Sequence, residues 1–205
     1  MKFLIVLSLL PITLSFLHPL SLLRPPTFIP AAPAADCPLP GTASIDTPWD
    51  ELGFEFRPSK SHVKVEHKNG SWGAPVLNPG DQVTMHVGAT ALHYGQACFE
   101  GLKAFAHKDG SVHLFRAPEN AARMQRSGER TVMPFLEEKA FVDACKVAVK
   151  DNMGYVPPFG SGGALYLRPL LFGSGPRIGL QPSDEYTFLC MVSDGRKTTN
   201  WRGGW

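Results

Sequence analysis

Residues 91–130 read ALHYGQACFEGLKAFAHKDGSVHLFRAPENAARMQRSGER and carry the densest set of structural signals in the chain. Residues 98–106 predict a strand, which follows a loop or a single helical turn over residues 91–96. Lys108-Asp109-Gly110 is a turn sequence, so residues 112–115 are expected to return as the partner of that strand. The stretch therefore predicts a β-hairpin.

Two helices are predicted around this hairpin. The first runs from Pro118 to about Gly128, because proline suits the first helical position and Glu119 complements the helix dipole. The second covers residues 137–152 and has one apolar stripe that is expected to face a core. That stripe consists of Phe141, Ala144, Cys145, Ala148 and Val149.

Short apolar or alternating segments elsewhere predict further strands. The turn sequence Asn69-Gly70 suggests that the first of these segments enters a tight hairpin. The predicted strands cover residues 62–67, 83–87, 164–172 and 186–192. With the two helices they predict an α+β fold, an antiparallel-rich sheet that the helices pack against.

The composition excludes several classes of protein. The 205 residues carry a net charge of +2 with 43% hydrophobic residues, which gives no indication of nucleic-acid binding. The four cysteines are far apart and form no CxxC pair, so reduced core thiols are expected. The histidines form no HExxH-type pair, so no metal site is predicted.

The N-terminal residues 1–45 differ from the rest and are assigned to a leader. An apolar run over residues 3–10, broken by Pro11, is too short to span a membrane and is typical of a signal peptide. No acidic residue occurs before Asp36. A two-part leader for import into a plastid is favoured; a mitochondrial leader, plain secretion and a misassigned start are the alternatives, and secretion would make Asn69 a glycosylation candidate.

Arg168 is the physical anomaly of the chain, because it lies inside the apolar segment 164–172. A guanidinium in such a strand is costly unless acceptors or an anion meet it. One interpretation is a structural ion pair, and the other is a pocket arginine that attracts a carboxylate. Tyr166 lies two residues earlier, so in a strand both side chains point to one face.

Three arginines follow one another along the first predicted helix, at Arg123, Arg126 and Arg130. Their spacing places them on one side of the helix. A solvated basic face is one interpretation of this pattern. A phosphate site is the other, since a guanidinium binds phosphate oxygens with two hydrogen bonds.

Several motifs together resemble the branched-chain amino-acid aminotransferases, pyridoxal-phosphate enzymes of fold type IV. The resemblance covers about residues 48–192 and takes in the core of the 91–130 stretch. The motifs are His93-Tyr94-Gly95, Phe99-Glu100-Gly101-Leu102-Lys103-Ala104, Leu114-Phe115-Arg116-Ala117-Pro118-Glu119-Asn120 with Arg123-Met124, Tyr166-Leu167-Arg168-Pro169 and Gly173-Ser174-Gly175-Pro176.

The resemblance implies a role for each matched residue. Arg123 would hold the phosphate of pyridoxal 5'-phosphate, and Arg168 would help to hold the substrate. Gly101 would let the backbone approach the ligand. The pocket for a branched side chain would be lined by Tyr94, Phe99 and Tyr166. The implied reaction moves an amino group between leucine, isoleucine or valine and 2-oxoglutarate, in a homodimer whose loop over 175–181 reaches the neighbouring subunit.

One part of the family pattern does not occur in this sequence. The family's Schiff-base lysine lies in a larger second domain near a Gly-Gly-Asn-Tyr motif, and no such motif is present. Lys103 and Lys197 do not match its position. Residues 46–192 are therefore expected to form the small N-terminal domain of the family, without a catalytic lysine, and residues 193–205 an aberrant tail.

These observations leave three hypotheses. The chain is the N-terminal portion of a branched-chain transaminase and is inactive alone. Alternatively, it is a non-catalytic truncated isoform that pairs with a full-length subunit. A third possibility is another fold-type-IV enzyme, such as a D-amino-acid transaminase or an aminodeoxychorismate lyase.

Overall fold

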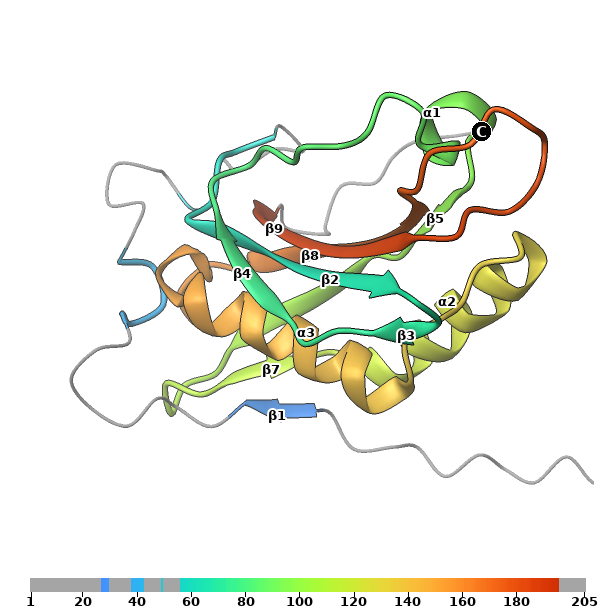
Figure 1. Cartoon of the computed structure of the whole chain (residues 1–205). Coiled ribbons are helices and arrows are strands. Elements are labelled where there is room, and N and C mark those ends of the chain that lie inside the picture. The colour runs from blue at the N-terminus through green and yellow to red at the C-terminus, as the bar shows by residue number, and fades with distance from the viewer. Residues whose placement is uncertain (1–26, 30–37, 43–48, 50–55, 196–205) are drawn as a thin grey trace, which may run out of the picture.

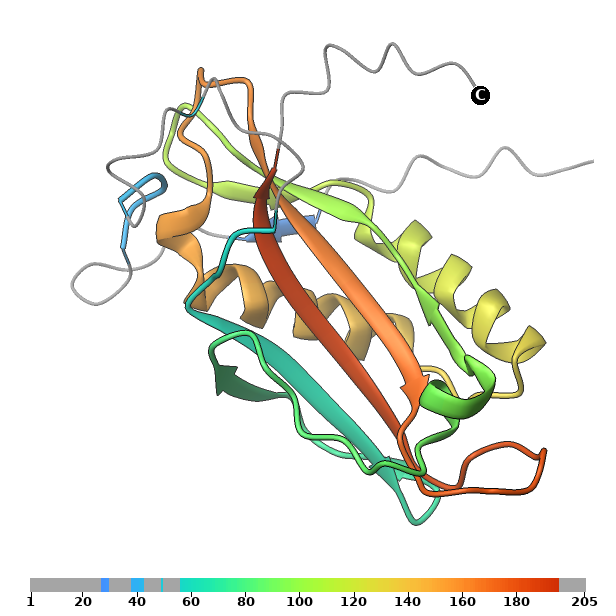
Figure 2. The ribbon, with the colours of Figure 1, turned by 90° about the horizontal axis from the view of Figure 1, so that it is seen from above.

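The computed structural model describes residues 27–29, 38–42, 49 and 56–195. These residues form one antiparallel sheet with two long helices on one face (Figures 1 and 2). The elements are β1 (Thr27–Ile29), β2 (Ser61–Lys68), β3 (Ser71–Trp72), β4 (Val76–Pro79), α1 (Thr90–Tyr94), β5 (Ala97–Phe99), β6 (Leu102–Ala106), β7 (Val112–Leu114), α2 (Ala117–Arg130), α3 (Glu138–Asp151), a 3-10 turn (Met153–Tyr155), β8 (Ala164–Gly173) and β9 (Tyr186–Gly195).

The two longest strands, β8 and β9, form the centre of the sheet. The strand order is β1-β7-β6-β8-β9-β2-β3, with β4 also pairing β2 and β5 also pairing β8. Every one of these described pairs is antiparallel. The predicted α+β class, with a sheet packed by two helices, is confirmed.

The core lies between the sheet and the two helices. Alternate residues of β8 and β9 point into it, and the rings of Phe141 on α3 and Phe188 on β9 meet edge to face with centroids 5.7 Å apart. Both rings are almost fully buried. Burial of one such side chain stabilises the fold by roughly 1.5–3 kcal/mol. The predicted apolar stripe of α3 therefore faces the core as expected.

Three predicted strands differ from the observed ones. Residues 83–87 form no strand, because both edges of β2 are already paired. Strand β9 pairs with one edge of β2, and β3 and β4 (Val76–Pro79) pair with the other. The strand predicted over 98–106 is interrupted after Phe99. Glu100 donates its backbone N–H to the carbonyl of Pro169 at 2.8 Å, and proline has no N–H to return. The last strand runs on to Gly195.

The first strand comes from the segment assigned to the leader. Thr27–Ile29 pairs with β7 at the edge of the sheet, with Thr27 opposite Leu114 and Ile29 opposite Val112. The other leader features lie outside the described residues. Among the described helices, none has the length and apolar character needed to cross a membrane.

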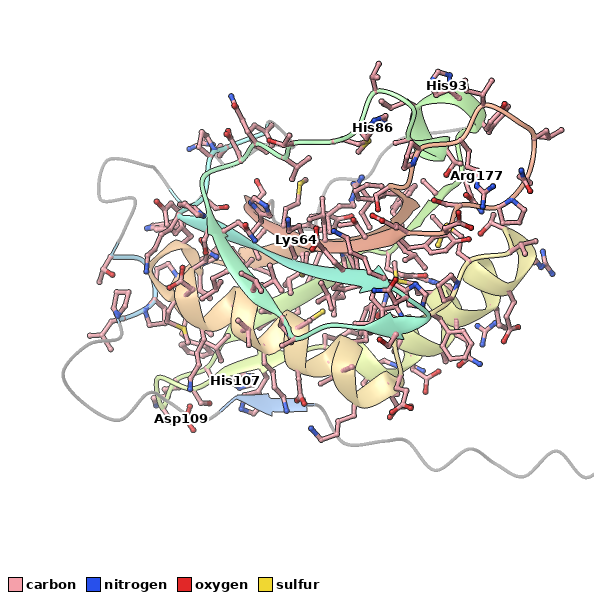
Figure 3. The ribbon with its side chains drawn as sticks, in the orientation of Figure 1. Lys64, His86, His93, His107, Asp109 and Arg177 are labelled. Carbon is pink, nitrogen blue, oxygen red and sulfur yellow. The ribbon has the colours of Figure 1, made fainter. Side chains whose placement is uncertain are left out.

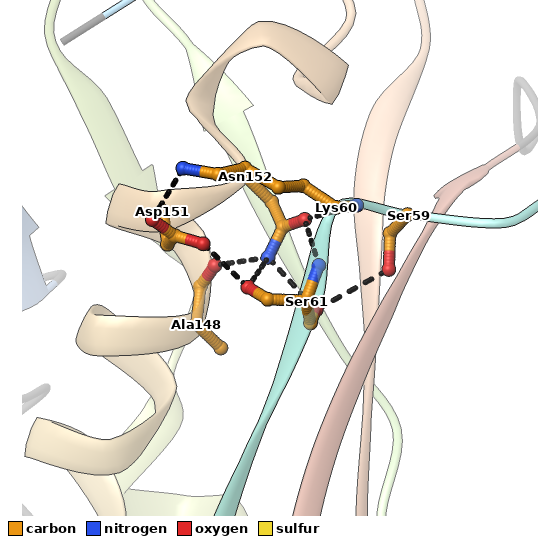
Figure 4. A network of polar contacts seen from close by, with 6 residues as sticks. All are labelled: Ser59, Lys60, Ser61, Ala148, Asp151 and Asn152. Atoms are coloured by element: carbon orange, nitrogen blue, oxygen red, sulfur yellow. Dashed lines mark hydrogen bonds and ion pairs between the residues drawn. The ribbon is translucent and has the colours of Figure 1, made fainter. Parts of the chain in front are cut away.

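A buried asparagine fastens the end of α3 to the start of β2 (Figure 4). The Asn152 side chain accepts hydrogen bonds from the backbone N–H groups of Lys60 and Ser61 at 3.0 and 3.3 Å. It donates to the carbonyls of Ser61 and Ala148 at 3.1 and 2.9 Å. Asn152 is fully buried, so these polar groups depend on one another rather than on water.

We predict that Asn152→Ala destabilises the protein by about 3 kcal/mol, because it leaves buried backbone groups without partners. Urea unfolding followed by circular dichroism measures the change. Lys139→Ala is the control, since the side chain of Lys139 is 88% exposed and its ion pair with Asp143 lies in solvent. Equal midpoints for the wild-type protein and the Asn152 variant would contradict the proposed anchoring.

Candidate active site

Three of the predicted site residues form a cluster on the face of the sheet opposite the helices. Tyr166 and Arg168 lie two residues apart on β8, and Arg168 Nε donates to the Tyr166 hydroxyl at 3.1 Å. The Arg168 guanidinium carbon lies 4.7 Å from the centre of the Phe99 ring and 5.3 Å from that of Tyr166. Aromatic faces stabilise a cation at such distances. Within the described residues, Arg168 is met by aromatic groups rather than by a carboxylate.

Gly101 joins this cluster for a steric reason. A Cβ atom at Gly101 would lie 2.5 Å from the Tyr166 hydroxyl oxygen and 3.2 Å from the ring carbon that carries it. The glycine therefore makes room for Tyr166. The role of Gly101 in admitting a ligand stays a prediction.

An apolar pocket of about 210 Å³ adjoins Arg168 on the same face. Its floor is formed by side chains of β8 and β9, and residues before β2 and after β4 close it. The polar side chains at its border are those of Ser59, His62, Asp81 and Arg168. The pocket is lined by Phe56, Ser59, His62, Gly80, Asp81, Val83, Arg168, Leu170, Leu189, Met191 and Val192.

Tyr94 lies apart from this cluster and holds a loop. Its hydroxyl donates to the carbonyl of Ile178, in the loop between β8 and β9. The same loop is tied to the chain before α1, where Arg177 N–H donates to the Gly88 carbonyl at 2.8 Å. Figure 3 shows Arg177, His86 and His93 around α1, far from His107 and Asp109. Tyr94 and the Tyr166 cluster are thus not brought together by any described contact.

Gln96 anchors both ends of that loop, and sequence reasoning missed it. Its carbonyl receives the Gly173 N–H at 3.0 Å, and its Oε1 accepts from Thr90 Oγ1 at 2.8 Å and from Ser183 N at 3.2 Å. The amides of Ser174 and Gly175 bond to the Glu185 carbonyl. The glycine-rich sequence at 173–175 is therefore used to close the loop, and these two amides are not directed at a phosphate.

Arg123 lies on the helix side of the sheet, where it meets a buried carboxylate. Arg123 Nε donates to both carboxylate oxygens of Glu100 at 2.7 and 2.9 Å, and Nη2 makes a further bond to Oε2. These hydrogen bonds raise the pKa of Arg123. The Glu100 side chain is 3% exposed and that of Arg123 is 59% exposed. Arg126 and Arg130 are exposed and make no such contact with the part of the chain that the structure describes.

The exposure of Arg123 fits a phosphate-binding role. Glu100 takes the Nε edge of the guanidinium, while most of the side chain remains open to solvent. A guanidinium has five N–H donors, so donors remain for an anion at the open edge. The donor set therefore fits the phosphate of a cofactor such as pyridoxal phosphate.

Lys103 lies on the same face as Tyr166 and directly opposite it across the β6–β8 pair. Partial burial lowers the pKa of its amine. The other lysine considered from the sequence, Lys197, lies outside the described residues. Cys98 lies close to the site, and burial together with the charge of Glu100 raises the pKa of its thiol to about 11. Cys98, Cys145 and Cys190 are free thiols, with the last two buried, and Cys37 is not among the described residues.

The chain is similar to branched-chain amino-acid aminotransferases of several organisms. No family model matches the sequence. The chain is 46% identical over 143 residues to a branched-chain-amino-acid aminotransferase of Haemophilus influenzae, covering 70% of this chain and 42% of that one. It is 40% identical to the enzyme of that name from Helicobacter pylori, covering 76% and 45%. A chloroplastic branched-chain amino acid aminotransferase 2 of Humulus lupulus is 44% identical, covering 72% and 36%.

A solved structure has a similar fold over part of its length. The branched-chain amino acid aminotransferase of Escherichia coli superposes with a TM-score of 0.50 at 23% identity, covering 66% of this chain and 40% of that one. The sheet and its helices therefore have the fold of part of that structure. The chain belongs to the branched-chain amino-acid aminotransferase family, and it spans less than half the length of the relatives that it matches.

We predict that Gly101→Ala destabilises the protein by roughly 1–3 kcal/mol, because the new methyl group overlaps the Tyr166 hydroxyl. Chemical denaturation of single and double variants tests this. The cost should be smaller in a Tyr166→Phe background, since that variant removes the closest atom.

Gly73→Ala is the matched control, because its Cβ would make only an ordinary 3.5 Å contact, and a change within about 0.5 kcal/mol is expected. An equal cost of Gly101→Ala in both backgrounds would show that Tyr166 is not what the glycine accommodates.

Proposed function

We propose that this chain forms part of a pyridoxal-phosphate-dependent branched-chain amino-acid transaminase. The observation that carries the proposal is the apolar pocket on the open face of the sheet, with the guanidinium of Arg168 at its border. The family relationship supports the same conclusion. The reaction would transfer an amino group between leucine, isoleucine or valine and 2-oxoglutarate.

The cluster of Phe99, Tyr166 and Arg168 binds the substrate in this proposal. The branched side chain enters the pocket beside Leu170 and Leu189, where burial of its methyl groups is favourable. The guanidinium of Arg168 attracts the carboxylate end of the substrate. Tyr166 and Phe99 hold that guanidinium in place and form the walls above the pocket. Tyr94 acts indirectly, by fixing the loop between β8 and β9.

Arg123 binds the cofactor phosphate in this proposal. Pyridoxal phosphate, when bound, supplies the electron sink that such a reaction requires. The chain's own contribution is to hold the phosphate and to orient the substrate. The Gly-Gly-Asn-Tyr segment with its lysine is absent from the sequence, so we propose that these 205 residues do not complete the catalytic site.

We make two further proposals. Assembly as a homodimer, with the loop over 175–181 reaching a neighbouring subunit, would fit Ile178 and Leu180, which are 94% and 85% exposed. Plastid import is supported by chloroplastic relatives from Humulus lupulus and Arabidopsis thaliana at 41–44% identity. A non-catalytic isoform that pairs with a complete subunit is the second candidate, favoured by the exposed aromatic face around Phe99.

We predict that 4-methylpentanoate, a carboxylate with the leucine side chain, binds the pocket through Arg168. Titration followed by methyl NMR should shift the signals of Leu170, Leu189 and Met191. Arg168→Met should weaken binding at least about tenfold, because it removes the cation that meets the carboxylate.

Lys64→Met is the control, because it removes a cation from the same face of the sheet but outside the pocket. This variant should bind 4-methylpentanoate with the affinity of the wild-type protein. Unchanged affinity of the Arg168 variant would argue against the substrate site.

We also predict that the 205-residue chain, mixed with pyridoxal phosphate and borohydride, forms no stoichiometric adduct at a single lysine. Peptide mass spectrometry locates any labelled amine. Lys103→Arg is the informative variant, because Lys103 is the lysine that faces Tyr166. The Lys103→Arg variant should carry the same pyridoxyl labels on its remaining lysines as the wild-type protein. A single full adduct that disappears in this variant, together with turnover of leucine, would refute the proposed incompleteness.

A further inference from the structure

Glu100 is a buried carboxylate to which the sequence motif assigns no role. It receives three hydrogen bonds from Arg123 and one from Asn120 Nδ2 at 2.9 Å. All of these partners are donors, and a carboxylate has only acceptors to offer them. An amide at this position would direct an N–H group at one of the donors. The chemistry of the site therefore calls for a carboxylate.

The two ends of the Arg123–Glu100 pair lie in different surroundings. Glu100 is 3% exposed and lies behind the guanidinium, whereas Arg123 is 59% exposed. The Nε edge of the guanidinium faces inward onto Glu100. The remaining donors belong to the outer edge, which can meet an anion arriving from solvent.

Asn120 connects this arrangement to the backbone of Gly101. Its Nδ2 donates both to Glu100 and to the Gly101 carbonyl, at 2.9 and 3.1 Å. Gly101 in turn packs on Tyr166. The residues that hold Arg123 are thus bonded to the backbone of the substrate-side cluster.

We infer that Glu100 is a positioning residue, which fixes the Arg123 guanidinium so that its outer edge binds the phosphate of the cofactor. This inference rests on the proposed function, in which Arg123 binds that phosphate. Glu100 touches neither the cofactor nor the substrate. It acts by holding a long, exposed side chain in one conformation before the anion arrives.

Two effects of Glu100 on phosphate affinity have opposite signs. Its negative charge repels the phosphate, and its hydrogen bonds remove conformational freedom from Arg123. The anion would bind at the exposed outer edge, where the high effective dielectric near the protein surface weakens the repulsion across the width of the guanidinium. Loss of the buried carboxylate instead frees the whole side chain. Positioning therefore outweighs repulsion.

Binding of pyridoxine 5'-phosphate and of pyridoxine to the full chain tests this inference. Neither probe has an aldehyde, so reaction with lysines does not contribute. Calorimetry should show that Glu100→Gln weakens binding of the phosphate ester about tenfold while leaving pyridoxine unchanged. The Arg123 Nε–H signal in NMR spectra should also lose its protection from exchange. Glu66→Gln is the control, because it removes the same negative charge from the open face of the sheet. This variant should bind pyridoxine 5'-phosphate as tightly as the wild-type protein does.

Asn120→Ala provides a second test in case Glu100→Gln unfolds. Asn120 contacts Glu100 and not Arg123 in the hydrogen bonds described, so the variant should weaken binding of the phosphate ester alone, by about threefold. Equal or tighter binding of the phosphate ester by the folded variants would overturn the positioning role. The wild-type chain is expected to bind pyridoxine 5'-phosphate more tightly than pyridoxine. If Arg123→Ala loses this preference and Glu100→Gln keeps it in full, only the present inference is rejected. No preference for the phosphate ester in the wild-type chain would reject the proposed cofactor role of Arg123 itself.

Discussion

The site depends on the fact that neighbouring residues of a strand point to opposite faces of a sheet. Phe99 and Gly101 face the open side, and Glu100 between them faces the helices. One short segment therefore serves both halves of the site. On the open side it provides a wall for Arg168 and space for Tyr166. On the helix side it provides the carboxylate for Arg123 and Asn120. A shift of this strand by one residue would exchange the two sets and destroy both.

Pro169 in β8 lies opposite the segment that serves both faces of the sheet. Its missing N–H interrupts the β-ladder where Glu100 and Gly101 pass it, so one extended segment is divided into β5 and β6, which keep a common register along β8. Asn120 from α2 then bonds to the Gly101 carbonyl. A helix side chain thus holds the segment at the point where the sheet holds it less firmly.

Much of the fold could be predicted from local patterns, because α2, α3, β8 and β9 each carry the periodicity of the element they form. The sequence did not predict that Val76–Pro79, rather than residues 83–87, forms the strand beside β2. Both segments contain apolar residues, and only the pairing within the whole sheet distinguishes them. Gln96 was equally hidden. Its partners Thr90, Thr131 and Ser183 come from three separate segments, and no local pattern indicates that they meet.

Glu100 differs from these cases, because its burial and its need for hydrogen-bond donors could be predicted from the sequence. A charge in an apolar strand drew attention to Arg168, and the same argument applies to Glu100. Alternation places Glu100 on the face of Leu102 and Ala104, which the helices cover, so a buried carboxylate in need of donors follows directly. Arg168 lies on the open face and is stabilised by aromatic rings instead. The face to which a charge in an apolar strand points therefore decides whether the charge needs a partner from within the fold or can remain available to a ligand.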